Sequence, residues 1–245
     1  MRSLFAKTQV DIGVRDPWNR NTFLLLNAQN PSLVREDRTG FNSTTVTGTI
    51  TSSSSPSKFN LSIRKNTGAN YIVVGGTGNA NLTMGTGNFT IETWIYADAA
   101  PGSSNYALFS FTSATSGTGR DVFLFQGNAA FGTGYKFGMY DGTSWPQHST
   151  VMTSGTWHHV AASRVSGVLY LSLDGQVENK GSYTKNMNAT TSVRVGSDGN
   201  NEHNWGFNID DLRVTKGVGR YTSNFPLPAG PFGGNPDGGT GYDAP

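Results

Sequence analysis

Carboxylates are the side chains in this sequence with the clearest potential for chemistry, because two of them flanking a glycosidic bond can hydrolyse it. Glu92 lies inside the strand-like stretch 88–98, but the 16 acidic residues are scattered and no strand-like stretch carries alternating carboxylates. We therefore predict that Glu92 is structural and that the protein is not an enzyme. The predicted partner of Glu92 is Arg164, which closes a second strand-like stretch at 157–164.

Metal binding is a second chemistry that histidine and carboxylate side chains allow. There are no cysteines, and His158 and His159 point to opposite faces of a strand, so they cannot ligate one metal together. Calcium needs about 6–8 oxygen ligands, and the polar loop 197–202 supplies carboxylates and amides. We expect no cofactor, with calcium as the alternative. Its candidate ligands are Asp198, Glu202 and Asp210, although Asp210 could equally accept backbone hydrogen bonds.

Carbohydrate recognition needs aromatic faces for stacking beside amides and carboxylates that bind hydroxyl groups. Two polar stretches that we expect in or near loops combine these side chains, and they are the candidate glycan-binding residues. The alternative is that their tryptophans pack over the ends of the domain, because burial is common for tryptophan. The candidates are Tyr140, Asp141, Trp145, His148, Asn200, Asn201, His203 and Trp205.

The elements that must position these residues are short strands. In the stretch 89–96, large side chains alternate on both faces, which predicts a central strand covered on each side. Asp174-Gly175 between two apolar runs predicts a hairpin. With 32 glycines and no long helical periodicity, the chain favours about a dozen strands in an antiparallel two-sheet sandwich.

The domain organisation follows from composition along the chain. We expect an N-terminal arm at 1–21, a β-sandwich at 22–228 and an extended C-terminal tail at 229–245. The tail is rich in glycine and proline, a composition that cannot bury a core of its own. The tail is therefore predicted to dock on a partner surface. The arm has more apolar residues than a solvated tail would carry, so it is predicted to dock on a neighbouring subunit, with packing on its own domain as the alternative.

Charge and hydropathy exclude two classes of partner. A net charge of +2 on 245 residues is too small to indicate nucleic-acid binding. No stretch approaches the roughly 18–20 apolar residues that a membrane span needs. The first residues also lack the apolar core of a signal peptide, since Lys7, Gln9 and Asp11 interrupt it.

Four blocks of the sequence together resemble a known family. They are Phe89-Thr-Ile-Glu-Thr-Trp-Ile-Tyr96, Trp157-His-His-Val-Ala-Ala-Ser-Arg164, Leu169-Tyr-Leu-Ser-Leu-Asp-Gly175 and Ile209-Asp-Asp-Leu-Arg-Val-Thr215 with its continuation to Phe225. Their order and spacing resemble the laminin G-like domains of the concanavalin A-like lectin/glucanase superfamily. That resemblance implies a curved jelly-roll sandwich whose loops recognise carbohydrate or protein. It does not imply catalysis, because many members are binding or structural modules.

The end of the last block, from Arg213 to Pro226, is similar to the version of this domain found in tailed-phage virion proteins. The resemblance therefore implies a non-enzymatic structural accessory protein on the exterior of a phage particle. Its role would be capsid decoration or tail or fibre attachment, with adhesion to host-surface glycans. We expect contacts with other virion proteins through 1–21 and 229–245, and a homo-oligomer on the particle. The alternatives are a free carbohydrate-binding lectin and, less favoured, a glycoside hydrolase.

Overall fold

The structure is a computed structural model, and the residues it describes are 19–28, 36–65, 70–76, 79–98, 105–112, 120–127, 134–188, 192–198 and 206–232. Most of the predicted arm (1–18) and most of the predicted tail (233–245) lie outside these residues.

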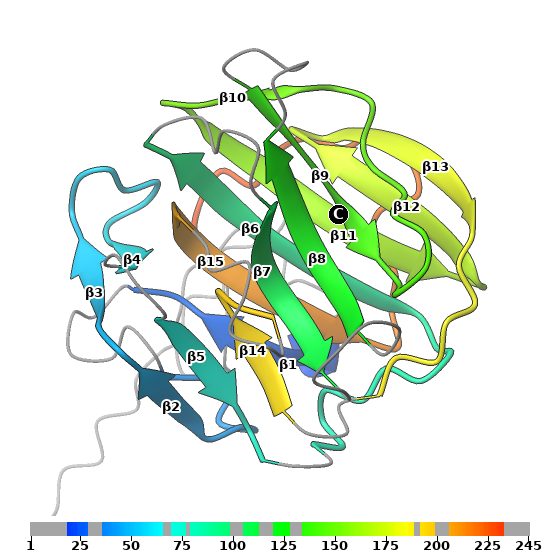
Figure 1. The fold of residues 1–245 in the computed structure, drawn as a ribbon, viewed down its shortest axis with the longest axis horizontal. Coiled ribbons are helices and arrows are strands. Elements are labelled where there is room, and N and C mark those ends of the chain that lie inside the picture. The colour runs from blue at the N-terminus through cyan, green and yellow to red at the C-terminus, as the bar shows by residue number, and fades with distance from the viewer. Residues whose placement is uncertain are drawn as a thin grey trace, which may run out of the picture.

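Two antiparallel sheets face each other (Figure 1). The larger sheet has the order β13 (Gln176–Ser182), β12 (Val168–Leu173), β11 (Trp157–Val165), β6 (Phe89–Ala97), β15 (Phe207–Lys216), β4 (Ser62–Lys65) and β3 (Ile50–Ser53), and β1 (Thr22–Leu26) also pairs with β15. The smaller sheet has the order β10 (Met152–Thr153), β9 (Gly134–Tyr140), β8 (Arg120–Gly127), β7 (Asn105–Thr112), β14 (Ser192–Val195), β5 (Tyr71–Val74) and β2 (Thr44–Thr47). The predicted all-β antiparallel two-sheet sandwich is confirmed.

Helical structure is limited in the described part of the chain. Its one helical element is the short 3-10 turn η1 (Asn19–Asn21). Within the described ranges, no helix has the length and apolar character needed to cross a membrane.

Strand β6 lies at the centre of the larger sheet, as its two-faced sequence pattern predicts. It pairs with β11 on one side and with β15 on the other, so the three predicted blocks are direct neighbours. Eight of its nine residues are buried. Residues directly opposite across an antiparallel pair share a face, so the register decides which side chains meet on each side of the sheet.

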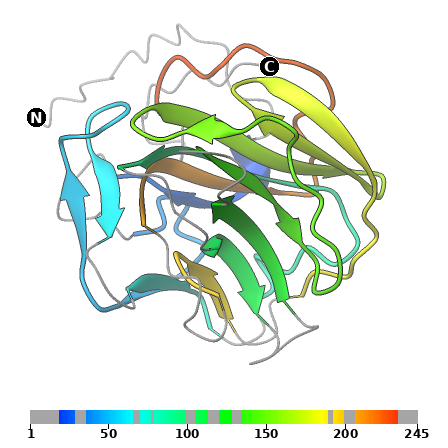
Figure 2. The same cartoon turned by 45° about the horizontal axis from the view of Figure 1, so that its top comes forward.

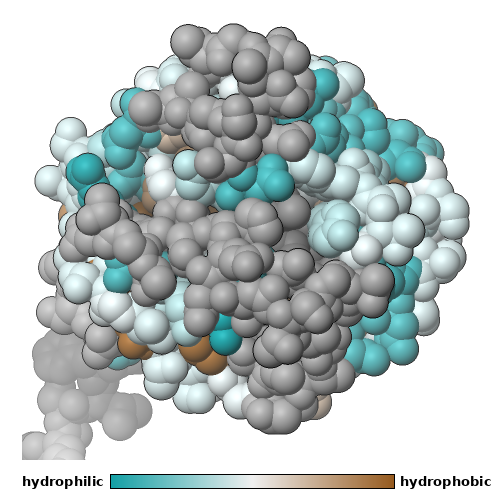
Figure 3. All heavy atoms as spheres, in the orientation of Figure 1, coloured by the Kyte–Doolittle hydropathy of each residue, from teal (hydrophilic) through white to brown (hydrophobic). Residues whose placement is uncertain are grey.

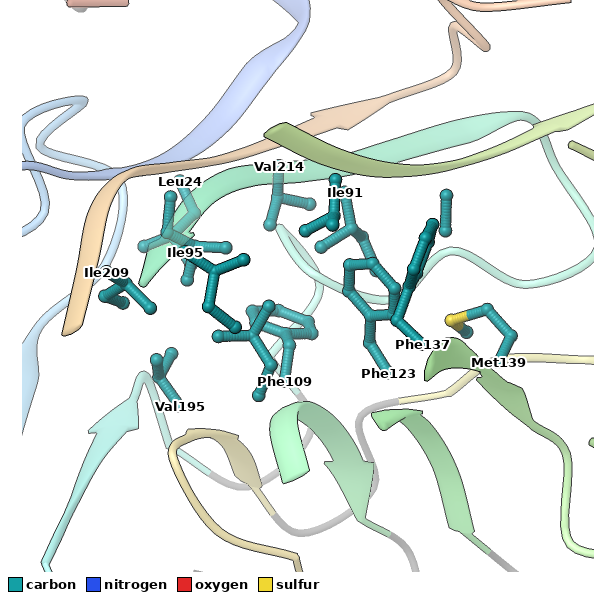
Figure 4. Close-up of a cluster of buried hydrophobic side chains, with 14 of the residues drawn as sticks. Leu24, Ile91, Ile95, Phe109, Phe123, Phe137, Met139, Val195, Ile209 and Val214 are labelled. Atoms are coloured by element: carbon teal, nitrogen blue, oxygen red, sulfur yellow. The ribbon is translucent and has the colours of Figure 1, made fainter. Parts of the chain in front are cut away.

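The core lies between the two sheets (Figure 4). Ile91, Ile95 and Val214 of the larger sheet point toward Phe109 and Phe137 of the smaller one. All five are essentially fully buried. Removing each such side chain from water contributes roughly 1.5–3 kcal/mol to the free energy of folding. The alternate residues face away from this core, so they can differ between the two sheets.

The outer side of the larger sheet is covered by residues 217–232, which we call the C-terminal strap. Figure 2 shows the strap crossing above that sheet. Phe232 is 2% exposed, and its ring lies 4.0 Å from the guanidinium carbon of Arg213 on β15. The packed part of the chain therefore reaches at least Phe232, beyond the predicted boundary between sandwich and tail at residue 228.

Candidate functional site

Glu92 lies on the outer face of the larger sheet, under the strap, and is fully buried. Its Oε1 accepts a hydrogen bond from Arg213 Nε at 2.9 Å, and Arg220 Nε lies 3.7 Å from the same oxygen. Tyr221 donates its hydroxyl proton to Oε2 at 2.7 Å, and His159 Nε2 lies 3.4 Å from that oxygen. Sheet and strap together therefore surround one carboxylate with two guanidinium groups, a phenol and an imidazole.

The electrostatics of this cluster hold Glu92 ionised. Burial alone opposes the charge, but Arg213, the His159 contact and Arg220 outweigh it and keep the pKa of Glu92 well below its usual range. Burial also raises the pKa of Tyr221, and the neighbouring Glu92 carboxylate adds to that effect. A general acid must carry a proton near neutral pH, so Glu92 is unsuited to that role.

The predicted pair between Glu92 and Arg164 is wrong. Opposite Glu92 on β11 stands Ala161, whereas Arg164 stands opposite Phe89 and so lies on the other face of the sheet. Arg164 donates instead to three backbone carbonyls, of Gly85, Gly87 and Lys185, at 2.6–2.8 Å. The sequence pattern placed both residues in strands but could not supply the register that separates them.

The predicted calcium ligands are not brought together where the structure describes them. Asp210 projects from the outer face of the larger sheet, where its Oδ2 accepts the N–H groups of Lys58 and Phe59. The carbonyl of Asp198 accepts a hydrogen bond from Arg194 of the smaller sheet. Packed sheets are about 10 Å apart, too far for one ion with ligands at 2.3–2.6 Å. Glu202 lies outside the described residues.

Within the described ranges, no group of three or more His, Asp or Glu side chains could hold a metal ion. Burial raises the pKa of Asp210 to about 6. His158 and His159 point to opposite faces as predicted, since His159 stands opposite Trp94 and His158 opposite the core residue Ile95.

Trp145 lies on the outer face of the smaller sheet. Phe137 and Met139 of β9 point into the core, so Gly138 between them faces outward. A Cβ at Gly138 would lie 2.8 Å from Trp145 Nε1 and 2.3 Å from the carbonyl oxygen of Pro146. The indole is therefore seated directly on the backbone of β9. With Tyr140, it packs against Ala107 of β7, and both aromatic rings are half-buried.

The loop that carries Trp145 is held by two sets of contacts. At its start, the Asp141 carboxylate accepts the N–H groups of Thr143 and Ser144 at 2.8 and 2.6 Å. Burial raises the pKa of Asp141, but these two N–H bonds, a hydrogen bond from the Ser144 hydroxyl and the positive charge of Lys185 lower it below its usual value. Asp141 therefore stabilises the turn, and its carboxylate is already engaged.

At the end of the same loop, His148 and Ser149 attach it to β13. The His148 ring stacks on Phe137 at 5.5 Å and is 2% exposed. Burial lowers its pKa, while the neighbouring Glu178 opposes that shift. Ser149 donates its N–H to both oxygens of Glu178, at 3.1 and 2.9 Å, and its hydroxyl also contacts that carboxylate. His148 is thus a packing residue of the loop, not a ligand-contacting one.

The second predicted group, Asn200, Asn201, His203 and Trp205, lies outside the described residues. Ser197, which comes just before this group, is described and lies at the same outer face as Trp145. Ser110 Oγ on β7 donates to the carbonyl of Ser197 at 2.9 Å. Through β8, Ser110 is aligned with Tyr140 two strands away, a separation of about 10 Å. Figure 3 views this side, and the described atoms visible around its rim are mostly hydrophilic or neutral.

Sequence reasoning missed the two residues that position Trp145 most directly. Gly138 carries a readable signal, since an isolated glycine inside a strand often marks a close backbone approach. Glu178 carries none, because its contact joins β13 of the larger sheet to Ser149 in a loop 29 positions away in the sequence. Of the predicted group, the structure brings Tyr140, Asp141 and Trp145 together at one end of β9.

Comparisons with known proteins give one family and several similar folds. The family model described as "Concanavalin A-like lectin/glucanases superfamily", of laminin G type, matches residues 66–218, which is more than half of the chain. A comparison with curated protein sequences finds no match.

Among solved structures, domain 4 of the extracellular arabinanase AbnA from Geobacillus stearothermophilus, in complex with arabinotriose, is similar. Its TM-score is 0.56 at 16% identity, covering 82% of this chain and 94% of that one. The binding domain of botulinum neurotoxin DC in complex with SialylT gives a TM-score of 0.57 at 14% identity, covering 82% of this chain. This chain spans about half of the neurotoxin domain (49%). At these identities the similarity shows the fold.

Proposed function

This chain belongs to the concanavalin A-like lectin/glucanases superfamily, and from that premise we propose that it binds carbohydrate on the outer face of its smaller sheet. The observation that carries the proposal is Trp145, seated on Gly138 beside Tyr140 in a loop held at both ends by hydrogen bonds. An indole that is fixed before binding loses little conformational freedom when a sugar ring stacks on it. Two structural neighbours, the arabinanase domain and the neurotoxin binding domain, are described with bound arabinotriose and SialylT.

The proposed role is binding without catalysis. Glu92, the carboxylate with the most central position, is held ionised between Arg213 and Arg220 beneath the strap. Asp141 is engaged by backbone N–H groups of its own turn. Neither carboxylate is a free acid beside Trp145, and a glycosidase needs one acid and one base or nucleophile about the scissile bond.

The binding proposal is tested with a matched pair of tryptophans. Trp145→Ala removes the indole on the smaller sheet, whereas Trp157→Ala removes a half-buried indole that packs at a tilt against Tyr96 of the larger sheet, with ring centroids 5.5 Å apart. A glycan array with neutral and sialylated oligosaccharides would identify a ligand, and calorimetry would give affinities. We expect Trp145→Ala to weaken binding about thirtyfold, as for a central aromatic contact of about 2 kcal/mol, and Trp157→Ala to leave it unchanged. Binding lost only in the Trp157 variant would refute the assignment of the face.

The cellular setting is a second part of the proposal. We infer that the protein is a structural accessory component of a tailed-phage virion, exposed on the capsid or tail, where it contributes to host-surface adhesion. The similarity of residues 213–226 to the virion form of the domain supports this. A variant restricted to residues 19–232, which keeps buried Phe232, should fold but no longer co-purify with particles. Co-purification of that variant at the wild-type level would contradict docking by the chain ends.

The alternative to carbohydrate binding without a cofactor is a site that contains calcium. Chelator-treated protein is titrated with CaCl₂ in a calorimeter, and its melting temperature is measured with and without the ion. We expect no heat and no shift, because Asp210 lies on the larger sheet whereas Asp198 follows β14 and is bonded to Arg194 of the smaller one. A saturable heat together with a higher melting temperature would establish a calcium site and overturn this part of the proposal.

A further inference from the structure

His148 is a buried titratable side chain in the loop that carries Trp145, and its two ring nitrogens have opposite hydrogen-bonding roles. Nδ1 lies 3.2 Å from the backbone nitrogen of Thr150, whose N–H can only donate. Nε2 lies 3.3 Å from the carbonyl oxygen of Gln176, which can only accept. Both contacts are satisfied when Nε2 carries the hydrogen and Nδ1 carries none, so the surroundings select one neutral tautomer of the ring.

A positive charge on His148 conflicts with this arrangement. The second proton would go on Nδ1, where it would face the N–H of Thr150. Two donors would then point at each other, so that hydrogen bond is lost and the backbone at Thr150 must move. The ring has little room to turn away, because it is 2% exposed and stacks on Phe137 with 15° between the ring planes. Protonation of His148 is therefore coupled to the position of the loop.

The charged groups around His148 offset only part of this cost. Glu178 of β13 favours the charge, but its Oε1 lies 3.6 Å from Nε2, on the side of the ring that already carries the hydrogen. Lys180 of β13 and Lys136 of β9 oppose a positive charge on the ring. Burial is the largest effect, and it lowers the pKa of His148 below its ordinary value of about 6.5. The ring is thus neutral at pH 7 and takes up its proton in the acidic range.

The backbone at His148 is paired with β9, the strand on which Trp145 is seated. The N–H of His148 donates to the carbonyl of Phe137 at 3.0 Å, and Gly138 and Gln147 form the adjacent β-bridge. This short ladder begins directly after the segment that carries the indole. A movement at the end of the loop would therefore act on the pairing that holds the indole against β9.

We propose that His148 is a proton switch that regulates the carbohydrate site. The neutral ring holds the loop against β9 with Trp145 in its binding position, whereas the protonated ring releases the end of the loop and weakens glycan binding. This inference rests on the proposed function, since it names how that same site is regulated. Because a single proton is involved, the logarithm of the affinity should fall by at most about one for each unit of pH.

The test measures affinity by calorimetry from about pH 5 to pH 7.5, with lactose as a neutral probe and sialyllactose as an acidic one. We expect both probes to bind about tenfold more weakly at the lower pH. An equal change for both would assign it to the protein, because the carboxylate of the acidic probe keeps its charge over this range. Buffers of different ionisation enthalpy should also show that binding at the lower pH releases up to about one proton.

Two substitutions separate His148 from another group that titrates in this range. His148→Asn keeps an uncharged acceptor near the position of Nδ1, so its affinity should stay within about threefold of the wild type at neutral pH and should not depend on pH. Asp210→Asn removes the carboxyl whose pKa burial raises to about 6, on the outer face of the larger sheet, and should keep the wild-type pH dependence of affinity. A pH dependence that persists in His148→Asn would overturn the proposal.

NMR titration of the wild type gives a second readout, in case His148→Asn disturbs the loop. Without glycan, the Thr150 amide and the His148 ring should titrate with one midpoint below about pH 6.5, and added glycan should lower that midpoint. A Thr150 amide that does not respond would overturn the switch. Binding that depends on Trp145 but not on pH would contradict this inference alone, whereas absence of binding by both probes at neutral pH would contradict the proposed function itself.

Discussion

The two outer faces of the sandwich differ in what covers them. On the larger sheet, the strap lies over a buried cluster of charges around Glu92. On the smaller sheet, the loop from Asp141 to Ser149 folds back on β9 and leaves Trp145 half-buried at the surface. A charged group in the middle of a sheet is therefore not by itself a sign of function. In this molecule the charges stabilise a closed face, and the face proposed for recognition carries aromatic rings.

Glycines permit both arrangements, each by close approach of backbone. Gly219 lets the strap cross next to β11, since a Cβ there would lie 2.7 Å from the carbonyl oxygen of Arg164. Gly217, with φ of +83°, turns the chain from β15 into the strap. Gly138 admits the Trp145 loop onto β9 in the same way. The closed face and the aromatic face are thus built by the same device at different strands.

The largest expected effect is a loss of stability caused by a change on the closed face, with glycan binding unchanged. Glu92→Gln leaves Arg213 and Arg220 buried without their carboxylate, and breaking a buried ion pair in this way typically costs about 3–5 kcal/mol. Urea unfolding should show this loss at pH 7. Glycan affinity of the folded fraction should stay at the wild-type value, and a parallel loss of affinity would contradict the independence of the two faces.

The next effect tests the aromatic face. Gly138→Ala puts a methyl group against the Pro146 carbonyl and the Trp145 indole, so the loop must move. We expect about 1–3 kcal/mol of destabilisation from overpacking, together with weaker glycan binding. Gly155→Ala is the matched control for a glycine in another loop, although its φ of +75° adds strain. Unchanged affinity in Gly138→Ala would mean that the position of Trp145 does not matter for binding.

A pH effect of smaller size is expected from the closed face. The pKa of Asp210 is raised by burial to about 6, above its unfolded value of about 3.9, so the folded state holds the proton more tightly. Stability should therefore fall as pH rises through 6, on the order of 1 kcal/mol between about pH 5 and pH 8. Asp210→Asn should remove this slope in denaturant unfolding across that range. A slope that persists in the variant would assign it to another group.

The smallest effect concerns the attachment of the aromatic loop to β13. Glu178→Gln keeps one acceptor for Ser149 but removes the negative charge that faces His148 and Lys180. We expect a loss of at most about 1 kcal/mol in stability and an affinity for glycan weaker by about two- to fivefold. Lys180→Ala, which leaves the bonds to Ser149 in place, is the control. Equal losses in both variants would show that the salt bridge, not the loop attachment, is responsible.

Much of the fold could be predicted because strand patterns are local. The alternation in 89–96 predicted a central strand, and Asp174-Gly175 predicted the hairpin between β12 and β13. Both depend on neighbouring residues alone. The partner of Glu92 could not be predicted in this way, since Arg213 is 121 residues away and a bulge in β15 sets which of its residues stands opposite.

The candidate site also has one part that the sequence could predict and one part that it could not. The sequence alone determined that aromatic and polar side chains gather around Tyr140 and Trp145, since these residues are close together in the chain. Only the tertiary structure decided that His148 and Asp141 are engaged in holding the loop while Trp145 rests on Gly138. The physical reason is that strand pattern depends on each residue and its neighbours, whereas burial and pairing depend on register and on what crosses above the sheet.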